Sequence, residues 1–334
     1  MRVLILGGSV FLGRAIADAG FALGHTVAVL NRGFSGPNPS EASAFTGDRM
    51  NPTILRAAAA AGPWDLVVDT SGFEPEQTTL SAQLLDNSSR RYVFVSSISA
   101  FRDWPAKPIS EKSPLLEFSE RERSYGSSKA ECERTLRATL GNRLTVVYPG
   151  LIIGPHENVG RLPWWLARHA RGGKIVHPES SSRITPIDAR DIANFILSLI
   201  DQEDVDDTRY VVSGSPSGPT LHDLLARCRR VTGNTAQPVR VADDLLLKLG
   251  VAPWTELPFW VPSGQGADAI WNTDPTVAIR AGLRFRHIDD TIADTWEWMT
   301  SIGAATDTSQ LPVFKDGTGL SAEKEEEILR AVQH

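Results

Sequence analysis

The chain has 334 residues, of which 41% are hydrophobic and 22% are charged, and this composition excludes disordered, collagen-like and coiled-coil proteins. The 40 acidic residues outnumber the 34 basic ones, and the resulting net charge of -6 provides no global positive field to attract nucleic acid or an anionic membrane. The two cysteines show no CxxC spacing, which fits a reducing compartment. We therefore expect a cytoplasmic protein with neither a nucleic-acid nor a membrane partner.

Short apolar runs alternate with helical patterns in the first half of the chain, which is typical of an α/β fold with a doubly wound parallel sheet of the Rossmann type. The opening run, Val3 to Leu6, is too short for a signal peptide or a membrane span, so we interpret it as the first buried strand. The pattern predicts strands at residues 2–6, 26–30, 66–69, 92–96 and 144–148. It predicts helices from about Leu12 to the glycine cap at Gly24, over 52–61, from Pro75 onward, and over about 124–140.

The composition changes after Pro149-Gly150, where Pro and Trp become dense and strands become sparse. Helices are predicted at 188–200 and 221–231, separated by long loops. We expect two domains, residues 1–150 and a smaller, mostly helical lobe of residues 151–334 that is partly interleaved with the first. The acidic run from Glu323 to Glu327 is interpreted as the solvated start of a terminal helix.

A glycine-rich turn follows the first strand and leads into a helix. Its sequence is Gly7-Gly8-Ser9-Val10-Phe11-Leu12-Gly13. Gly7 permits a tight turn, Gly13 permits close packing of helix on strand, and the first N–H groups of the helix can face a pyrophosphate. Because Val10 replaces the central glycine of GxGxxG, a plain strand-turn-helix connection stays open as the alternative. The predicted dinucleotide-binding residues of this turn are Gly7, Ser9, Val10, Phe11, Leu12 and Gly13.

The second strand ends in Asn31-Arg32-Gly33, where an NAD-specific site would place an acid for the ribose hydroxyls. An arginine there suits a 2′-phosphate, so NADP(H) is favoured as cofactor, with NAD as the alternative; a solvated loop cation is the other interpretation of Arg32. Further on, Asp48 is placed to meet an adenine amino group, with Arg49 beside it, although a simple turn aspartate is equally consistent. Thr70, Ser71 and Gly72 follow a strand and are predicted to let backbone pass close to a ribose.

Tyr125 and Lys129 lie four residues apart, which places both on one face of a helix. A phenol with a pKa near 10 is a poor acid or base at neutral pH, and a nearby cation lowers that pKa by favouring the phenolate. Upstream, an apolar strand ends in hydroxyls at Ser96-Ser97. In a doubly wound sheet this brings Ser97 to the edge where ligands bind, so Ser97 can donate to a carbonyl oxygen while Tyr125 supplies a proton.

These motifs resemble the extended short-chain dehydrogenase/reductases, a family also described as NAD-dependent epimerase/dehydratase-like. The resemblance spans nearly the whole chain and also includes the segments Tyr148 to Pro155 and Asp188 to Asp191. It implies that Ser97 polarises the substrate oxygen, that Tyr125 is the acid/base, and that Lys129 binds the nicotinamide ribose and lowers the tyrosine pKa. It further implies a homodimer, an NAD(P)-binding domain at 1–150, a substrate-binding lobe at 151–334, and cofactor contacts from Ser96, Tyr148, Pro149, Gly150 and Ile152.

Three positions depart from that family. Val10 replaces the central glycine, Tyr148 stands where an arginine is common, and Phe101 stands where sugar-nucleotide epimerases commonly have a tyrosine. The departures put a nucleotide-sugar substrate in doubt and leave the roles of Ser97, Tyr125 and Lys129 intact.

Candidate substrate contacts combine aromatic walls with a few polar groups, as suits a ring-bearing or sugar-like ligand. Adjacent tryptophans such as Trp164-Trp165 are more often packing residues, and Arg183 is as consistent with a surface ion pair as with holding an anion. Trp254, Trp260 and Trp271 suit a lid or a dimer contact, but loop packing is favoured. The predicted substrate-binding residues are Phe73, Ser99, His156, Asn158, Arg161, Trp164 and Arg183.

Together these features predict an NADP(H)-dependent oxidoreductase that acts on a carbonyl or secondary alcohol of a small molecule by Ser-Tyr-Lys chemistry. A sugar epimerase or dehydratase and a natural-product ketoreductase are variants of the same chemistry. The alternative is a non-catalytic nucleotide-binding or regulatory protein of the same fold, RNA-associated in some relatives. The sequence has no HExxH motif, Cys/His cluster, GxSxG elbow or P-loop, so we expect no metal, hydrolase or P-loop site, and Arg227 to Arg230 is interpreted as a solvated face.

Overall fold

A computed structural model describes residues 1–201, 209–233, 235–264, 267–306, 309, 311 and 318–332. The chain forms two compact units. The first unit comprises Met1–Ile152, Ile187–Pro216 and Thr273–Phe285, and the second comprises Ile153–Pro186, Ser217–Asn272 and Arg286–His334. Two segments beyond residue 150 therefore return to the first unit.

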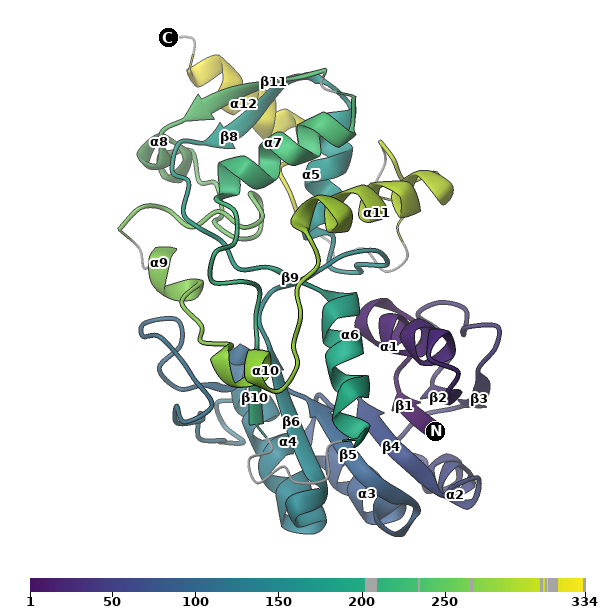
Figure 1. Ribbon diagram of the computed structural model, residues 1–334. Helices are drawn as coiled ribbons and strands as arrows, with labels where there is room; N and C mark the ends of the chain where they lie inside the picture. Colours follow the sequence, from purple (N-terminus) through teal and green to yellow (C-terminus); the bar gives the residue numbers. More distant parts are fainter. Residues whose placement is uncertain are drawn as a thin grey trace. The chain divides into compact units, whose positions relative to one another are not determined.

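The first unit is built on a seven-stranded sheet in which every pair of neighbouring strands is parallel (Figure 1). The strand order is β10-β6-β5-β4-β1-β2-β3, which confirms the predicted doubly wound α/β fold. The strands are β1 (Arg2–Leu6), β2 (Thr26–Asn31), β3 (Ser43–Thr46), β4 (Trp64–Asp69), β5 (Ser89–Val95), β6 (Leu144–Pro149) and β10 (Arg209–Val212).

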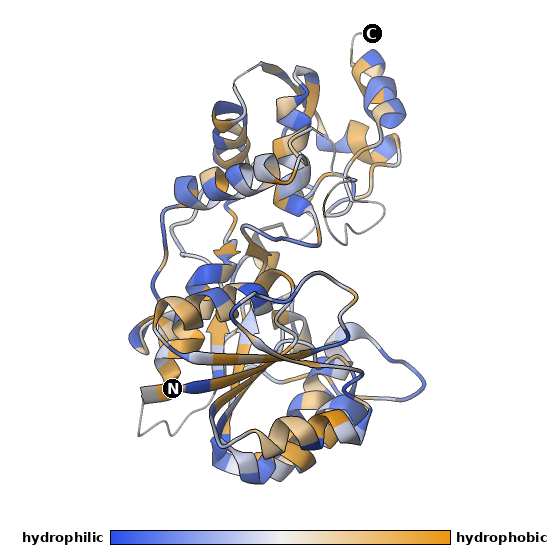
Figure 2. Ribbon diagram, turned by 90° about the vertical axis from the view of Figure 1, so that its right-hand side faces the viewer, coloured by the Kyte–Doolittle hydropathy of each residue, from blue (hydrophilic) through white to orange (hydrophobic). Residues whose placement is uncertain are grey.

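Two of these strands, β3 and β10, lie at the sheet edges and were not among the predicted strands. β3 is only four residues long and mostly exposed, so it lacks the apolar run that marks the inner strands. β10 follows a stretch that lies outside the described residues, and the sequence pattern placed it in the second lobe. The inner strands are buried along most of their length, and Figure 2 shows the hydrophobic colour along them.

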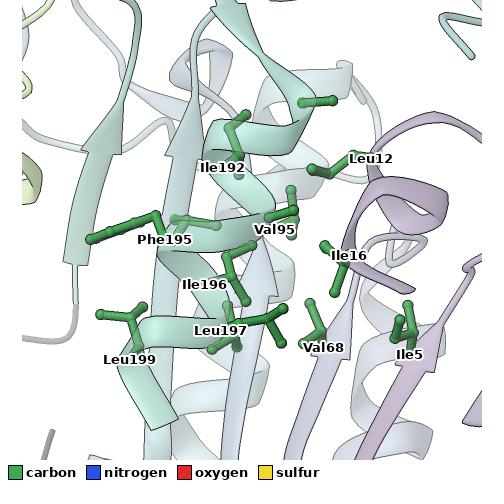
Figure 3. Close-up of a cluster of buried hydrophobic side chains, with 14 of the residues drawn as sticks. Ile5, Leu12, Ile16, Val68, Val95, Ile192, Phe195, Ile196, Leu197 and Leu199 are labelled. Carbon is green, nitrogen blue, oxygen red and sulfur yellow. The ribbon is translucent and has the colours of Figure 1, made fainter. Parts of the chain in front are cut away.

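Helices cover both faces of the sheet. On one face, α1 (Phe11–Ala22) packs against α6 (Ala189–Ser198), and Leu12, Ile16, Ile192 and Ile196 join strand residues in one buried cluster (Figure 3). On the other face, α2 (Pro52–Ala60), α3 (Pro75–Leu85) and α4 (Tyr125–Leu140) cover a second buried cluster. The helix predicted at 188–200 is α6; Asp188 caps it by accepting the N–H of Arg190, and it belongs to the first unit rather than to the second lobe.

The strand order reverses between β1 and β4, which run side by side although α1, β2, β3 and α2 separate them in sequence. In open parallel sheets this reversal point opens a crevice at the carboxyl ends of the strands. The residues that follow β1, β4 and β5 therefore share one edge of the sheet, and this edge carries the candidate site.

The second unit contains a two-stranded parallel sheet and several helices. Arg168 and Glu325 form a buried ion pair at 2.6 Å, and Glu325 also accepts the N–H of Val176. The prediction that Glu323 to Glu327 is a solvated stretch is therefore wrong at Glu325, because this carboxylate ties the last helix to α5 and β8. The elements are β8 (Gly173–Pro178) and β11 (Ala236–Val241) with α5 (Arg161–Ala170), α7 (Leu221–Val231), α8 (Asp243–Lys248), α9 (Ala267–Ile270), α11 (Ile288–Ser301) and α12 (Ala322–Ala331).

Three short elements complete the description. The chain leaves the first unit through β7 (Ile152–Ile153) and re-enters it at β9 (Ile187–Asp188), and α10 (Thr276–Arg280) adds Ala278 to the cluster around α1 and α6. In the described part of the chain, no helix is long and apolar enough to cross a membrane.

Candidate functional site

The turn after β1 is shaped by glycines that no other residue could replace without displacing neighbours. Gly7 and Gly8 have φ of +117° and +95°, a region that side chains disfavour. A Cβ on Gly7 would lie 2.3 Å from Thr70 Oγ1, and one on Gly13 would lie 2.5 Å from the backbone N of Gly8. The helix therefore begins in direct contact with the turn, and the absent side chain of Gly13 permits this contact.

The first turn of α1 is left without a side-chain cap. Val10 occupies the N-cap position in an extended conformation and makes no capping hydrogen bond, and no acidic residue lies in that turn. Backbone N–H groups at a helix start need an acceptor, and the helix dipole favours an anion there. The cradle formed by Gly7 to Gly13 thus fits the diphosphate of a dinucleotide by its own geometry.

Asn31 ends β2 and Arg32 follows it, and their side chains have different surroundings. The Asn31 amide donates to Gly7 O at 3.3 Å and to Asn38 Oδ1 at 2.6 Å, and its Oδ1 accepts the Gly33 N–H. Asn31 therefore ties the two loops together with its own side chain. Arg32 is exposed, so its guanidinium can reach a phosphate in solution.

Asp48 and Arg49, predicted together as adenine contacts, point to different surroundings. Asp48 is exposed and accepts the N–H of Met50, which is the simple turn left open by the sequence. The placement of Arg49 among the cofactor contacts is wrong, because its guanidinium is buried in a bidentate ion pair with Asp69 at 2.8 and 2.7 Å. The adjacent opposite charge explains this burial.

The segment after β4 lies beside the glycine turn. Thr70 donates its hydroxyl to Leu6 O at 3.0 Å, and the Ser71 N–H reaches Asp69 Oδ1 at 3.1 Å. Gly72 is enclosed, since a Cβ there would lie 2.6 Å from Thr78 Cγ2 and 3.0 Å from Phe94 Cε2. Backbone of the loops after β1 and β4 thus meets at the point where the strand order reverses.

The start of α4, which carries Tyr125, packs against the turn that carries Ser97 through a glycine contact. Ser97 follows β5 and accepts the N–H of Ser99, while Tyr125 is the first residue of α4, behind a capping box of Ser124 and Ser127. A Cβ on Gly126 would lie 2.0 Å from Ser99 O, so the start of α4 rests against the turn that carries Ser97. Tyr125 is 54% exposed, and the positive end of the helix dipole at that position favours its phenolate.

Lys129 is almost fully buried, one helical turn after Tyr125. Its Nζ donates to Gly72 O and Val95 O, both at 2.8 Å, and lies 4.8 Å from the ring centres of Phe73 and Phe94. Burial lowers the pKa of Lys129 to about 8, and the Asp69 carboxylate opposes this effect. Phe73, predicted to contact substrate, is half exposed with its ring against this ammonium.

The residues near the end of β6 lie deeper than predicted. Tyr148 is fully buried, donates its hydroxyl to Glu133 on α4 and packs its ring 4.7 Å from Phe101, so its side chain is wrongly placed among the cofactor contacts. The Ser96 hydroxyl is buried and has no hydrogen-bond partner among the described residues. Pro149 is buried, Gly150 donates its N–H to Val212 O, and Ile152 packs partly into the α1–α6 cluster.

The candidate substrate residues of the second unit have different surroundings. His156 and Arg161 are part-buried beside aromatic rings, with His156 5.1 Å from Trp298 and Arg161 5.7 Å from Trp254. Trp164 is 4% exposed and belongs to the core, as its alternative interpretation held. The remaining two are part-buried Asn158 and exposed Arg183, whose guanidinium donates to Gly218 O.

Glu157 and Asp69 are buried carboxyl groups that the sequence interpretation missed. Glu157 accepts the N–H groups of Arg161 and Leu162 at the start of α5, and burial raises its pKa to about 7. Asp69 is the last residue of β4 and is fully buried in the first unit. The available signal for Asp69 was an acid that directly ends an apolar strand, Leu66 to Val68, where a charge needs a buried partner.

Comparisons with known proteins agree with this architecture. The chain matches the model of the Epimerase family, described as the NAD dependent epimerase/dehydratase family, over residues 3–213. A curated relative, the chloroplast stem-loop binding protein of 41 kDa b from Arabidopsis thaliana, is 24% identical over 247 residues, which cover 70% of this chain and 63% of the relative. The chain thus matches less than two thirds of that relative's length.

Solved structures with the same fold are epimerases and related enzymes. A UDP-glucose 4-epimerase has a TM-score of 0.70 at 14% identity, and the match covers 90% of this chain and 98% of that one. The Bordetella bronchiseptica enzyme WbmG, solved in complex with NAD and UDP, has a TM-score of 0.68 at 18% identity, and the match covers 96% of this chain and 99% of that one. Because the family model spans more than half of its residues, this chain belongs to the NAD dependent epimerase/dehydratase family, a family of enzymes.

Proposed function

We propose that the protein is an NADP(H)-dependent oxidoreductase that acts on a carbonyl or secondary alcohol of a small molecule. The observation that carries the proposal is the edge of the first unit, where an uncapped helix start, the Ser97 hydroxyl, the Tyr125 phenol and the Lys129 ammonium follow strands of one sheet. Gly7 to Gly13 would hold the diphosphate, and the exposed Arg32 would select the 2′-phosphate. When bound, the nicotinamide would supply or accept the hydride.

The hydroxyl of Ser97 is suited to polarise a substrate oxygen. Its Oγ already accepts the Ser99 N–H at 3.1 Å, so its own proton can be donated to a carbonyl oxygen. Tyr125, exposed at the start of α4, would give its phenolic proton to that oxygen or take it back in the reverse direction. The charge on Lys129 and the helix dipole would both stabilise the phenolate between these steps.

Binding and turnover test this proposal separately. We expect calorimetric titration to show NADPH binding that is tighter than NADH binding, and Arg32→Ala to weaken NADPH alone. A screen of carbonyl substrates should then reveal consumption of NADPH that Tyr125→Phe abolishes without changing dinucleotide affinity. Absence of dinucleotide binding would reject the proposal.

A second candidate function rests on the curated relative, which is named as a stem-loop binding protein. It would make this chain an RNA-associated protein that keeps the fold. The net charge of -6 argues against it, because phosphate contacts dominate RNA affinity. Filter binding with a stem-loop RNA at two salt concentrations decides the matter: retention that falls steeply with salt, without NADPH turnover, favours the RNA-associated function.

A further inference from the structure

A buried group of charged and polar side chains lies beneath the candidate site and takes no part in the steps proposed above. Its centre is Asp69, which is 0% exposed. Its carboxylate accepts two N–H groups from Arg49 at 2.8 and 2.7 Å and the Tyr92 hydroxyl at 2.9 Å. Buried ion pairs are weak evidence for stability, since their attraction is offset by the loss of hydration. This pair therefore calls for a role beyond holding the fold together.

Arg49 and Lys129 approach Asp69 from different elements. The Arg49 guanidinium also donates to Ser81 Oγ on α3 at 2.7 Å. Gly72 links Asp69 to Lys129. A Cβ on Gly72 would lie 3.0 Å from Asp69 Oδ2, and the Gly72 carbonyl accepts a hydrogen bond from Lys129 Nζ at 2.8 Å. Asp69 thus pairs directly with Arg49 and adjoins Gly72, whose carbonyl holds the Lys129 ammonium of the candidate catalytic set.

The surroundings of Lys129 leave it short of compensation for its charge. It is 2% exposed, and its contacts are two neutral carbonyls, of Gly72 and Val95, and two aromatic rings. Carbonyls and ring faces attract a cation but do not neutralise it. The ionisable groups that act on Lys129 are Asp69 from β4, Arg49 from the loop after β3 and Cys132 from α4 itself, and Asp69 is the group that favours the charged form most.

We propose that Asp69 is a positioning residue that keeps Lys129 as an ammonium ion beside Tyr125, and that Arg49 moderates this effect by neutralising part of the Asp69 charge. The assignment rests on the proposed function only in the use that Tyr125 makes of the ammonium. The electrostatic coupling itself belongs to the free protein. Two variants then act in opposite directions: Asp69→Asn makes Lys129 lose its proton more easily, whereas Arg49→Met makes it hold the proton more tightly.

Direct titration of Lys129 tests the coupling. Protein labelled with ¹³C at lysine Cε is titrated by NMR, and the Lys129 signal is identified by its loss in Lys129→Met. We expect a transition near pH 8 in the natural protein. It should fall by about one pH unit or more in Asp69→Asn, rise by a similar amount in Arg49→Met, and lie between these limits in the double variant.

Folding is checked by near-ultraviolet circular dichroism at each pH. If Asp69→Asn does not fold, Arg49→Met and the charge-balanced double variant still decide the question, because the proposal requires the transition of Arg49→Met to lie above those of both the natural protein and the double variant. Equal transitions in the folded variants would overturn the proposal. A purely structural role for the ion pair predicts lower stability in both single variants, without opposite movements of the Lys129 transition.

The pH dependence of activity is the second test of the coupling. In the natural protein we expect the alkaline limb of the kcat/KM profile to follow the Lys129 transition, and to move in the same direction as that transition in each variant. If the NMR transitions move as expected but no dinucleotide-dependent turnover is found, the proposed function fails while the coupling stands. If turnover is found and the transitions do not move, the coupling alone fails.

Discussion

The loop after β1 and the loop after β4 lie at the same edge of one sheet, yet they are built by opposite means. The first depends on missing side chains: a Cβ on Gly7 or Gly8 would meet the side chain of Thr70 or Val29, a Cβ on Gly13 would meet the Gly8 backbone, and Val10 leaves the helix start uncapped. The second depends on buried charge. Asp69 and Arg49 form a buried ion pair, and Lys129 is enclosed by backbone carbonyls and aromatic rings. One loop is shaped by sterics and the other by electrostatics.

The difference teaches which changes each loop tolerates. In the glycine turn, a methyl group added at Gly13 would meet the Gly8 backbone, which cannot rotate aside as a side chain can. The loop after β4 is also sterically enclosed at Gly72, but it depends in addition on charge, because an unpaired ion in the interior is costly. Variants that alter volume alone should therefore test the glycine turn, and variants that alter charge alone should test the loop after β4.

The largest effect on activity is expected for Tyr125→Phe, which removes the phenolic hydroxyl at the start of α4. If Tyr125 is the acid/base, kcat should fall by roughly 10³-fold, the range typical of losing a general acid. The ring stays in place, so NADPH affinity measured by calorimetry should change less than about twofold. Turnover of a carbonyl substrate checks the first expectation, and an unchanged kcat would contradict the assigned role.

Next in size is Gly13→Ala, which tests the steric character of the glycine turn. The new Cβ would lie 2.5 Å from Gly8 N and 2.9 Å from Gly8 Cα, and overpacking against backbone should lower the free energy of unfolding by about 3 kcal/mol. Urea unfolding measures this loss. Gly20→Ala is the matched control, because the same helix there faces only the movable Val27 side chain at 2.8 Å.

For that control the gain in helix propensity of about 1 kcal/mol offsets much of the crowding, so its stability should stay within about 1 kcal/mol of the natural protein. Equal losses in the two variants would mean that contact with the turn is not what makes Gly13 necessary.

The steric loop could be predicted from the sequence, and the electrostatic loop could not. Glycines at the connection between a buried strand and a helix indicate a tight turn with close packing, so Gly7 and Gly13 predicted the turn by their residue type and position. Tyr125 and Lys129 were likewise predicted to share a helix face, and the structure has α4 begin at Tyr125. The strands were found because inner strands of parallel sheets read as apolar runs, whereas short, exposed β3 carries no such run.

Charges buried by partners far away in sequence leave no local pattern. Arg49 and Asp69 are 20 residues apart, and Arg168 and Glu325 are 157 residues apart, so Arg49 was predicted to contact the cofactor and Glu325 to face solvent. Tyr148 was misplaced for the same reason, since its partner Glu133 lies on another element. The residue type predicts that a buried charged or polar side chain needs a partner, but only the three-dimensional structure shows which residue that partner is.

The third prediction concerns pH and stability, and it measures the electrostatic loop without reference to activity. Lys129 has a pKa of about 8 in the folded protein, against an ordinary value of 10.5. Between these values the unfolded chain binds more protons than the folded one, so the contribution of Lys129 makes stability rise as pH rises from about 8 to 10.5. A difference of about 2.5 pH units corresponds to a contribution of up to about 3 kcal/mol.

The measurement is urea unfolding of the natural protein and Lys129→Met at pH 7.5 and pH 10. Other groups titrate in the same range, so the informative quantity is the difference between the two proteins. Stability should increase with pH more, or decrease less, in the natural protein than in Lys129→Met. Parallel pH dependences would show that Lys129 has an ordinary pKa, and the electrostatic description of this loop would then be wrong.

The smallest effect is expected at Arg32, which stands beside the steric loop but acts by charge. Because Arg32 is exposed, its attraction for a 2′-phosphate is screened by water and salt, so Arg32→Ala should weaken NADPH binding by about tenfold, or about 1.4 kcal/mol. NADH lacks that phosphate and should bind equally well to both proteins. Calorimetry at two salt concentrations checks this, since the NADPH difference should shrink as salt rises. Equal weakening of NADPH and NADH binding would instead show that Arg32 maintains the conformation of its loop and does not bind the 2′-phosphate. The loop after β2 would then act by shape, as the glycine turn does.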